Sequence, residues 1–298
     1  MPPPVPLVAV LGRGIVPIDT PIIRADDAGL QRGDGVFEAI HVRWRQPVRL
    51  AEHLARLRRS AARVDLPLPS EDALADLVVR LCRVWPDTAE AAVRLVCSRG
   101  TAGTDSGTVF AVISAVSDDI LRLRRDGVSA ATARLGYTVD VRRQAPWLLG
   151  GVKLLSYAVA MAAQRWAAAR GMDDVVWVSE EGFVLEGATS TVVWLDGDVL
   201  CSVPETAGVV PGTTAHWLVS NARTLGWTTQ ERLVTPEALA AADGVWLLSA
   251  IRGGTAVRTL DGKRVSHDHR LTAKILKVTG HSVDPRPVGA DLRQPEPA

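Results

Sequence analysis

The sequence predicts an α+β protein with two domains, and three observations support this prediction. Its 298 residues reach the length at which one hydrophobic core usually gives way to two. A hydrophobic content of 47% is enough to build both cores. Strand-like and helix-like segments are mixed without the regular alternation of a doubly wound sheet. We therefore expect a small N-terminal α+β domain over residues 1–117, a connector over 118–125, a larger C-terminal domain over 126–282 and a disordered tail over 283–298.

The first domain is expected to contain two helices and five strands. Apolar residues recur at helical spacing over Leu50–Val64, and a second helix follows the N-cap candidate Ser70 and runs to about Trp85. The charged run Asp118–Arg125 then leads out of the domain. Strands are expected where apolar residues cluster between turn signals, over Leu7–Val10, Gly14–Pro17, Gly35–Arg45, Ala91–Ser98 and Val109–Val116.

The second domain mixes further strands with four helices. An Ala-rich helix is expected over Tyr157–Arg170, because Gly171 is a typical helix end. Another begins at Pro211-Gly212 and runs to about Gly226, and two more cover Pro236–Ala242 and His269–Val278. The strands are expected over Val128–Leu135, Val175–Ser179, Phe183–Glu186, Ser190–Leu195, Val245–Ser249 and Ala256–Leu260.

Composition argues against several classes of protein. The net charge near +1 gives no attraction to nucleic acid or to anionic membranes. No apolar run reaches the roughly 18 residues that span a bilayer, and the N-terminus lacks the basic start of a signal peptide. Three widely separated cysteines indicate reduced thiols rather than a disulfide framework. We therefore expect a cytoplasmic protein.

Lys153 is the first candidate for chemistry. Only four of the 34 basic residues are lysines, yet Lys153 ends the apolar run Ala145-Pro-Trp-Leu-Leu-Gly-Gly-Val-Lys153. An amine in such a setting loses solvation, which favours its neutral, nucleophilic form, whereas an arginine cannot lose its proton. Two interpretations stay open from this residue alone. Lys153 is either a Schiff-base lysine or a lysine that extends its amine from a strand end to water.

Three further segments would fit a phosphorylated cofactor bound to that lysine. Glu186 lies between two apolar strands, where a carboxylate needs a partner such as the ring nitrogen of pyridoxal phosphate. Gly212, Thr213 and Thr214 begin a helix whose free N–H groups and hydroxyls suit a phosphate. Arg56 could bind a phosphate bidentately. The ordinary alternatives are a solvated glutamate at a strand end, a Pro-Gly turn with a threonine cap and a solvated basic face.

Three other motifs are discounted. Arg32-Gly-Asp34 has the spelling of an adhesion tripeptide, but it leads into a strand and is expected to form a structural turn. His267-Asp-His269 is too small a set of ligands to predict a metal site. Gly12-Arg-Gly lacks the third glycine and the following helix of a dinucleotide-binding loop. We expect neither a metal nor a dinucleotide cofactor.

The order and spacing of the remaining segments resemble the fold type IV pyridoxal phosphate enzymes. This family contains branched-chain aminotransferases, D-amino acid aminotransferases and aminodeoxychorismate lyases. The resemblance covers about residues 7–280 and implies a two-domain, D-amino acid aminotransferase-like fold, pyridoxal 5'-phosphate as cofactor and a homodimer. It rests on Arg32-Gly-Asp-Gly-Val-Phe-Glu38, Glu52-His-Leu-Ala-Arg56-Leu57, Lys153-Leu-Leu-Ser-Tyr157, Glu186-Gly-Ala-Thr-Ser-Thr and Val210-Pro-Gly-Thr-Thr214.

The resemblance also implies a role for each candidate. Lys153 would bond covalently with the cofactor and move protons, and Glu186 would pair with the pyridine nitrogen. Arg56 and the helix start at Gly212–Thr214 would hold the phosphate. Tyr157 would contact a cofactor oxygen, although it follows the lysine one residue sooner than in branched-chain enzymes.

Within the family, the closest likeness is to actinobacterial-type 4-amino-4-deoxychorismate lyases. Pro146-Trp-Leu-Leu149 before Lys153 is similar to their lysine region. D-amino acid aminotransferases resemble Ser98-Arg-Gly-Thr101 but continue into an Arg-x-His, where this chain has Thr104-Asp-Ser106. That difference argues against D-amino acid activity. Leu154 departs from the lyase pattern, which has a threonine there.

This likeness implies a lyase that converts 4-amino-4-deoxychorismate to 4-aminobenzoate and pyruvate in folate biosynthesis. A branched-chain or D-amino acid aminotransferase of the same fold is the alternative, because both reactions begin with the same proton removal. A protein that holds the cofactor without turnover is less consistent with the presence of both Lys153 and Glu186.

The small-molecule substrate of such a lyase has two carboxylates, so a cation is expected beside the cofactor. Arg252 and Arg99 are the candidates, and an ordinary surface arginine is the alternative for each.

Overall fold

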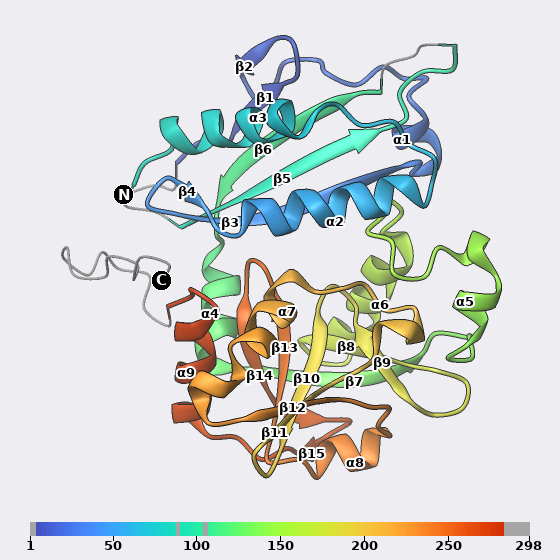
Figure 1. Cartoon of the computed structure of the whole chain (residues 1–298), viewed down its shortest axis with the longest axis vertical. Coiled ribbons are helices and arrows are strands. Elements are labelled where there is room, and N and C mark those ends of the chain that lie inside the picture. The colour runs from blue at the N-terminus through green and yellow to red at the C-terminus, as the bar shows by residue number, and fades with distance from the viewer. Residues whose placement is uncertain (1–3, 88–89, 104–106, 283–298) are drawn as a thin grey trace.

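The computed structural model describes residues 4–87, 90–103 and 107–282, which form two β-sheets with helices packed against them (Figure 1). Figure 1 shows one sheet with α2 and α3 in the upper half, the other sheet with α5–α9 in the lower half, and α4 between them. The mixed order of strands and helices confirms the α+β class. The domain boundaries stay a prediction. The tail expected over 283–298 lies outside the described residues.

The first sheet is antiparallel throughout, in the order β2-β1-β6-β5-β3-β4. Its five main strands lie within two residues of their predicted bounds, and Ala91–Ser98 is reproduced without change. The two-residue β4 and the short helix α1 were not predicted, because neither has an apolar face to reveal it. The elements are β1 (Leu7–Val10), β2 (Gly14–Val16), α1 (Ala28–Arg32), β3 (Gly35–Arg43), β4 (Gln46–Pro47), β5 (Ala91–Ser98) and β6 (Val109–Ala115).

Two amphipathic helices, α2 (Leu50–Ala62) and α3 (Glu71–Val84), pack against this sheet. Leu57 of α2 and Leu81 of α3 are fully buried in the shared core, as their helical spacing predicts. Ser70 caps α3, with its hydroxyl accepting a hydrogen bond from a backbone N–H of the first turn. The packing fixes one face of α2 against β3, so side chains that extend from these two elements keep a defined relative position.

The segment predicted only as a charged connector forms a helix, α4 (Asp118–Asp126). Ser117 accepts a hydrogen bond from the Ile120 N–H at 3.4 Å, and acidic residues in the first turn with basic residues in the last favour the helix dipole. Gly127 ends the helix with φ at 75°. The many charges on α4 concealed it from a prediction based on apolar periodicity.

The second sheet is nine-stranded within the described residues and has the order β12-β11-β10-β13-β14-β7-β8-β9, with β15 paired to β14. β7 is parallel to both β14 and β8, and β11 is parallel to β12. The sequence did not predict β11, β12 or β15, and every residue of β12 is exposed, so it has no apolar alternation. The strands are β7 (Val128–Arg134), β8 (Asp174–Val178), β9 (Val184–Gly187), β10 (Thr191–Asp196), β11 (Val199–Ser202), β12 (Thr228–Glu231), β13 (Gly244–Ser249), β14 (Gly253–Leu260) and β15 (Lys263–Arg264).

The helices of this half largely agree with the prediction. The helix expected from Pro211 to Gly226 divides into α7 and a short 3-10 helix, η3 (Ala222–Leu225). The four-residue α5 was not predicted, and it precedes the Lys153 segment. The helices are α5 (Val141–Gln144), α6 (Ala158–Ala168), α7 (Thr213–Ser220), α8 (Pro236–Ala240) and α9 (His269–Val278).

A buried polar cluster joins the two sheets. Arg124 of α4 donates to Glu90 Oε2 at 2.8 Å, to the Ile251 carbonyl at 2.7 Å and to the Arg252 carbonyl at 3.1 Å. Glu90 Oε2 also lies 3.0 Å from His41 Nε2 on β3. The Arg124 side chain is fully buried and that of Glu90 is 7% exposed. Arg124 therefore places one charge of α4 between the two sheets.

The segment Thr279–Ser282 lies against the same cluster. Arg43 and Arg49, both from the first half of the chain, donate to its backbone carbonyls. His281 stacks on His41 with ring centroids 4.6 Å apart and planes at 8°. The last described residues are therefore bound to the first sheet.

The stacked histidines make the stability of the fold sensitive to acid. Burial lowers the pKa of His41, although Glu90 opposes this, and burial beside His41 and Arg124 lowers the pKa of His281 well below its usual value. Folding therefore favours neutral imidazoles, so their stabilisation is present above about pH 6.5 and is lost as the pH falls below it. We expect the free energy of unfolding to decrease by about 1–2 kcal/mol between about pH 7 and pH 5.

Chemical unfolding followed across this pH range checks the prediction. His281→Gln should flatten the slope below about pH 6.5. His216→Gln is the matched control, because His216 is exposed on α7 and should leave the slope unchanged. Equal slopes in the wild type and in the His281 variant would contradict the prediction.

Candidate active site

Lys153 lies between the 3-10 helix η1 (Pro146–Leu148) and α6, in a stretch that lies beside β3. Its N–H donates to Ser60 Oγ at 3.2 Å, and its carbonyl accepts from the Phe37 N–H at 3.2 Å. Its Nζ lies 3.2 Å from the Tyr157 hydroxyl and 4.5 Å from the centroid of the Phe37 ring. The amine is therefore half-buried and is held between a hydroxyl and an aromatic face.

The Phe37 ring contacts a second cation, Arg94, in addition to Lys153. The Phe37 and Tyr157 rings meet edge to face, with centroids 5.1 Å apart. The guanidinium carbon of Arg94, on β5, lies 4.2 Å from the centroid of the same Phe37 ring. Leu154, which departs from the lyase pattern, pairs with β3 through an isolated bridge and so helps to fix the lysine beside Phe37. An exposed arginine and the Lys153 amine thus lie against one ring.

Glu186 extends from β9 with its side chain 15% exposed. Its Oε2 accepts a hydrogen bond from the Val210 N–H at 3.0 Å, and its Oε1 lies 3.8 Å from Arg142 Nη1. Burial raises the pKa of Glu186, and the Val210 N–H, Arg142 and Lys153 act in the opposite direction. Burial therefore favours the protonated carboxyl group, whereas these neighbours favour its ionised form.

Arg56 is held in place by a buried carboxylate. Its Nε and Nη2 both donate to Glu38 of β3 at 2.7 Å, while its Nη1 donates to the Pro211 carbonyl at 2.8 Å. His53, one turn earlier on α2, binds the same carboxylate at 2.7 Å. Burial alone would raise the pKa of Glu38, but Arg56 and His53 lower it to about 2. Arg56 is thereby fixed at the start of α7 with N–H groups still free to bind an anion.

The start of α7 fits a phosphate group. Gly212 is the N-cap residue and provides no side-chain cap, so the first N–H groups of the helix are left for another acceptor. A Cβ at position 212 would collide with Thr191 Oγ1, so only glycine fits there. Thr213 and Thr214 are buried, and Thr214 Oγ1 has no hydrogen-bond partner within the described part of the chain. A buried hydroxyl without a partner needs one, and a phosphate oxygen would supply it.

The candidate residues are connected through two short stretches of chain. Phe37 of β3 contacts Lys153, whereas the next residue of the strand, Glu38, extends to the opposite face of the sheet and holds Arg56. Residue 210 donates to Glu186, whereas residue 211 accepts from Arg56. The structure therefore connects Glu186 and Arg56 through the segment just before α7 and places Lys153 beside β3, while the assigned roles of these residues stay predictions.

The two predicted substrate cations are already paired. Arg99 binds Asp34 through Nε at 2.6 Å and the Val64 carbonyl through Nη2 at 2.6 Å. Arg252 is buried and lies 2.7 Å from Asp174 Oδ2 through its Nη1. Any further anion would have to compete with these acids for Arg99 or Arg252. The pairing of Arg99 with Asp34 also gives the Arg32-Gly-Asp34 motif a structural role.

Four residues of this region were not assigned a role from the sequence: Phe37, Glu38, Arg94 and Arg142. Glu38 is a carboxylate among the apolar residues Val36, Phe37, Ala39 and Ile40, a setting that signals a buried partner. Arg94 looked like an ordinary outward-facing strand residue. Arg142 lies in a segment that the sequence did not assign to any element.

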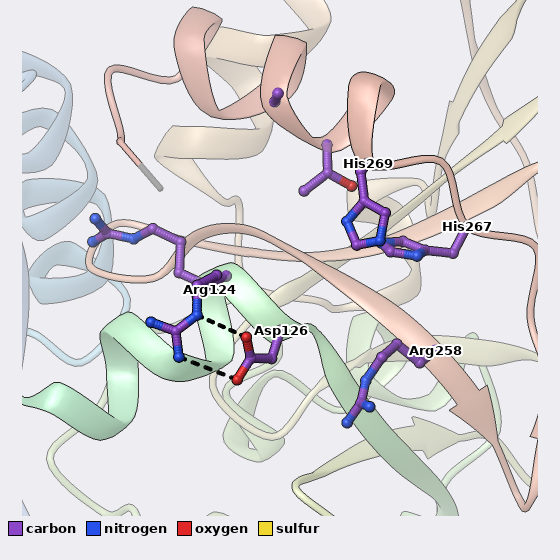
Figure 2. A pocket seen from close by; sticks show the side chains of 8 residues that line it. Arg124, Asp126, Arg258, His267 and His269 are labelled. Atoms are coloured by element: carbon purple, nitrogen blue, oxygen red, sulfur yellow. Dashed lines mark hydrogen bonds and ion pairs between the residues drawn. The ribbon is translucent and has the colours of Figure 1, made fainter. Parts of the chain in front are cut away.

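A separate cavity of about 510 Å³ lies among α4, β14 and α9 (Figure 2). Arg258, His267 and His269 contribute to its wall, with the two imidazole rings 4.2 Å apart, and Arg125 is paired with Asp126. None of the candidate site residues lines this cavity.

Among the described residues, no three His, Cys, Asp or Glu side chains gather in a group that could hold a metal ion. Nor is any helix among them long and apolar enough to cross a membrane.

Comparison with known proteins identifies the family. The model of the class IV aminotransferases matches residues 35–260. The bifunctional aminodeoxychorismate lyase / D-amino acid transaminase of Mycobacterium tuberculosis is 38% identical over 268 residues, covering 87% of this chain and 93% of that protein.

Two solved structures of a hypothetical aminotransferase from Mycobacterium tuberculosis are similar to this chain. Its PLP-bound form has a TM-score of 0.89 at 35% identity, and its α-ketoglutarate and PMP bound form has a TM-score of 0.88 at 36% identity. Each alignment covers 92% of this chain and 98% of the solved one. These findings confirm the expected fold type IV architecture and the expectation of a pyridoxal phosphate enzyme. The chain therefore belongs to the class IV aminotransferase family.

Proposed function

We propose that this protein is a pyridoxal phosphate-dependent lyase that converts 4-amino-4-deoxychorismate to 4-aminobenzoate and pyruvate, a step toward folate. The observation that carries the proposal is the 38% identity with a relative described as having that lyase activity. The replacement of Arg-x-His by Thr104-Asp-Ser106 adds support from the sequence, although these residues lie outside the described ones. Because the same relative is also described as a D-amino acid transaminase, transamination of D-amino or branched-chain amino acids is the second candidate.

Each contact with the cofactor is assigned to a residue of the site. Lys153 would bond with the aldehyde, and Glu186 would face the ring nitrogen. Arg56, Thr214 and the first N–H groups of α7 would hold the phosphate, for which the unpartnered Thr214 hydroxyl is the specific support. Tyr157 would contact the cofactor beside the lysine amine, from which its hydroxyl lies 3.2 Å away.

The chemistry depends on proton movement by Lys153. Bound pyridoxal phosphate spreads the negative charge that forms when a carbon next to the substrate amine loses a proton. Lys153 is the nearest base candidate for that proton, and Tyr157 orients its amine. Lyase and transaminase activities share this proton removal and differ in their later steps, so contacts with the substrate decide between them.

Arg94 is our candidate for binding a substrate carboxylate. It shares the Phe37 ring with the lysine amine, whereas Arg99 and Arg252 are paired with acids. Arg94→Ala should raise KM about 10- to 100-fold, the loss of a charge-assisted hydrogen bond, with a smaller change in kcat. Steady-state kinetics would measure this, with Arg99→Ala as the comparison. A larger effect on KM from Arg99→Ala would restore Arg99 as the binding residue.

We also propose a cytoplasmic homodimer. Trp147 and Val159, six residues either side of Lys153, are 76% and 64% exposed, which would suit an interface that reaches the site. The three cysteines are buried and unbridged, in keeping with a reducing compartment. Light scattering coupled to size-exclusion chromatography would show a monomer if the dimer proposal were wrong.

The lyase proposal is tested with purified protein loaded with pyridoxal phosphate. One reaction receives 4-amino-4-deoxychorismate, and the other receives an amino acid panel with a 2-oxo acid acceptor. Release of 4-aminobenzoate and pyruvate in equal amounts, absent with Lys153→Ala, would support the lyase. Transamination without any release of 4-aminobenzoate would replace it with the second candidate.

A further inference from the structure

Arg142 is a partly buried cation, two nitrogens of which are buried without a hydrogen-bond partner among the described residues. It lies on α5, and its side chain is 16% exposed. Its Nε and Nη1 are buried without a hydrogen-bond partner in the part of the chain that the structure describes. Glu186 is its one ion-pair partner among those residues, with Nη1 and Oε1 3.8 Å apart. Burying guanidinium N–H groups without hydrogen bonds costs free energy, so we expect an interaction that offsets this cost.

The surrounding backbone is shaped around the Arg142 stem. A Cβ at Gly150 would lie 2.8 Å from Arg142 Cβ, and a Cβ at Gly208 would lie 2.8 Å from the same atom and 3.2 Å from Arg142 Cδ. Either contact is too close for a side chain to occupy. Gly150 and Gly208, which lie in separate segments, therefore leave the space that the Arg142 side chain occupies beside Glu186.

The two oxygens of Glu186 have different surroundings. Oε2 is fixed by the Val210 N–H at 3.0 Å, whereas Oε1 faces the Arg142 guanidinium at a distance beyond a hydrogen bond. Arg142 therefore acts on the carboxylate by charge, while leaving Oε1 free to accept from another donor. A carboxylate can hold a protonated ring nitrogen only when it is itself ionised, and burial opposes that ionisation.

We propose that Arg142 is a positioning residue that acts through Glu186, keeping the carboxylate ionised and its Oε1 free for the pyridine nitrogen of the cofactor. This inference rests on the proposed binding of pyridoxal phosphate but not on the choice between lyase and transaminase. An opposite charge within about 4–6 Å favours the ionised carboxylate by about 10-fold or more. Without Arg142, Glu186 should be ionised less often, so the pyridine nitrogen of the cofactor should be protonated less often and the ring should withdraw electrons less strongly. No contact with the substrate is removed by this change.

The experiment compares Arg142→Gln with Arg143→Gln in the holoenzyme. Arg143 is the matched control, because it is the next residue of α5 and its side chain is 64% exposed beside Asp140. Arg142→Gln should lower kcat about 10-fold or more with KM changed less than about 3-fold, and it should shift the pH titration of the visible absorbance of the bound cofactor. Arg143→Gln should leave both measurements unchanged. Arg142→Lys keeps the charge and should recover most of the rate.

A double-mutant cycle separates action through Glu186 from a direct role. In a Glu186→Gln background, Arg142→Gln should add less than about a 2-fold further loss of kcat, because the group on which it acts is gone. An additive loss, a raised KM or an unshifted absorbance titration would overturn the proposal. If Arg142→Gln does not fold, Arg142→Lys, which keeps the charge, is compared with Arg142→Met, which removes it. Identical absorbance titrations of these two variants would also overturn the proposal. A wild-type protein that binds no pyridoxal phosphate would instead refute the proposed function before any variant is made.

Discussion

Replacing Lys153 with alanine is expected to lower turnover by about 10⁴-fold or more, the largest functional effect of any single change in this chain. The variant loses both the covalent link to the cofactor and the base that moves the proton. The visible absorbance of the covalently bound cofactor should also disappear. Steady-state assays with an absorbance spectrum of the reconstituted protein measure both effects.

Lys153→Arg is the matched variant for this prediction. It keeps a positive charge beside Phe37 and Tyr157, but a guanidinium cannot supply a neutral amine, so the variant should be equally inactive. The Lys153 backbone carries the hydrogen bonds to Ser60 and Phe37, so both variants should fold normally. Activity within about 10-fold of the wild type in either variant would refute the role of Lys153 as nucleophile and base.

Arg124→Met should destabilise the fold by about 3–5 kcal/mol, the largest expected effect on stability. Its guanidinium is fully buried and binds Glu90 together with three backbone carbonyls, and methionine can replace none of these bonds. Burial would raise the pKa of Glu90, but His41 and Arg124 lower it to about 2. Removing Arg124 therefore leaves a buried carboxylate with much of its compensation lost.

Denaturant unfolding of the two proteins at neutral pH measures this difference. Arg122→Met is the control, because Arg122 lies on the same helix with its side chain 46% exposed, 3.8 Å from Asp119. It should change the free energy of unfolding by less than about 0.5 kcal/mol. Equal stability of the Arg122 and Arg124 variants would contradict the interpretation of this cluster as a link between the sheets.

Much of the fold was predictable from the sequence wherever one face of an element is buried. Ala91–Ser98 and His269–Val278 have their predicted bounds, because apolar periodicity reports burial directly. The helix over Asp118–Asp126 was not predicted, because its buried residue is an arginine. The fully exposed Thr228–Glu231 strand was also not predicted, because its pairing comes from backbone hydrogen bonds that leave no hydrophobic pattern.

The candidate site was only partly predictable for a related reason. Lys153 and Glu186 stood out as charged residues in apolar surroundings, and Arg56 stood out for its suitability for a phosphate. The structure connects Glu186 and Arg56 through residues 210 and 211. The sequence indicated Arg99 and Arg252 as candidate substrate-binding cations, and the structure pairs each of them with an acid that is distant along the chain. Which charges neutralise one another depends on tertiary contacts, so a sequence contains the charges without showing which ones remain available.

The attachment of Thr279–Ser282 to the first sheet affects the order in which the molecule can assemble. The bonds from Arg43 to Gly280 and from Arg49 to Thr279 join residues 237 and 230 positions apart. During synthesis the first sheet can form early, because all its strands precede residue 116. The stack of His281 on His41 must wait until nearly the whole chain has emerged. Until then His41, Arg43 and Arg49 lack their contacts with Thr279–Ser282, so the nascent chain leaves these polar side chains uncovered until its last segment has emerged.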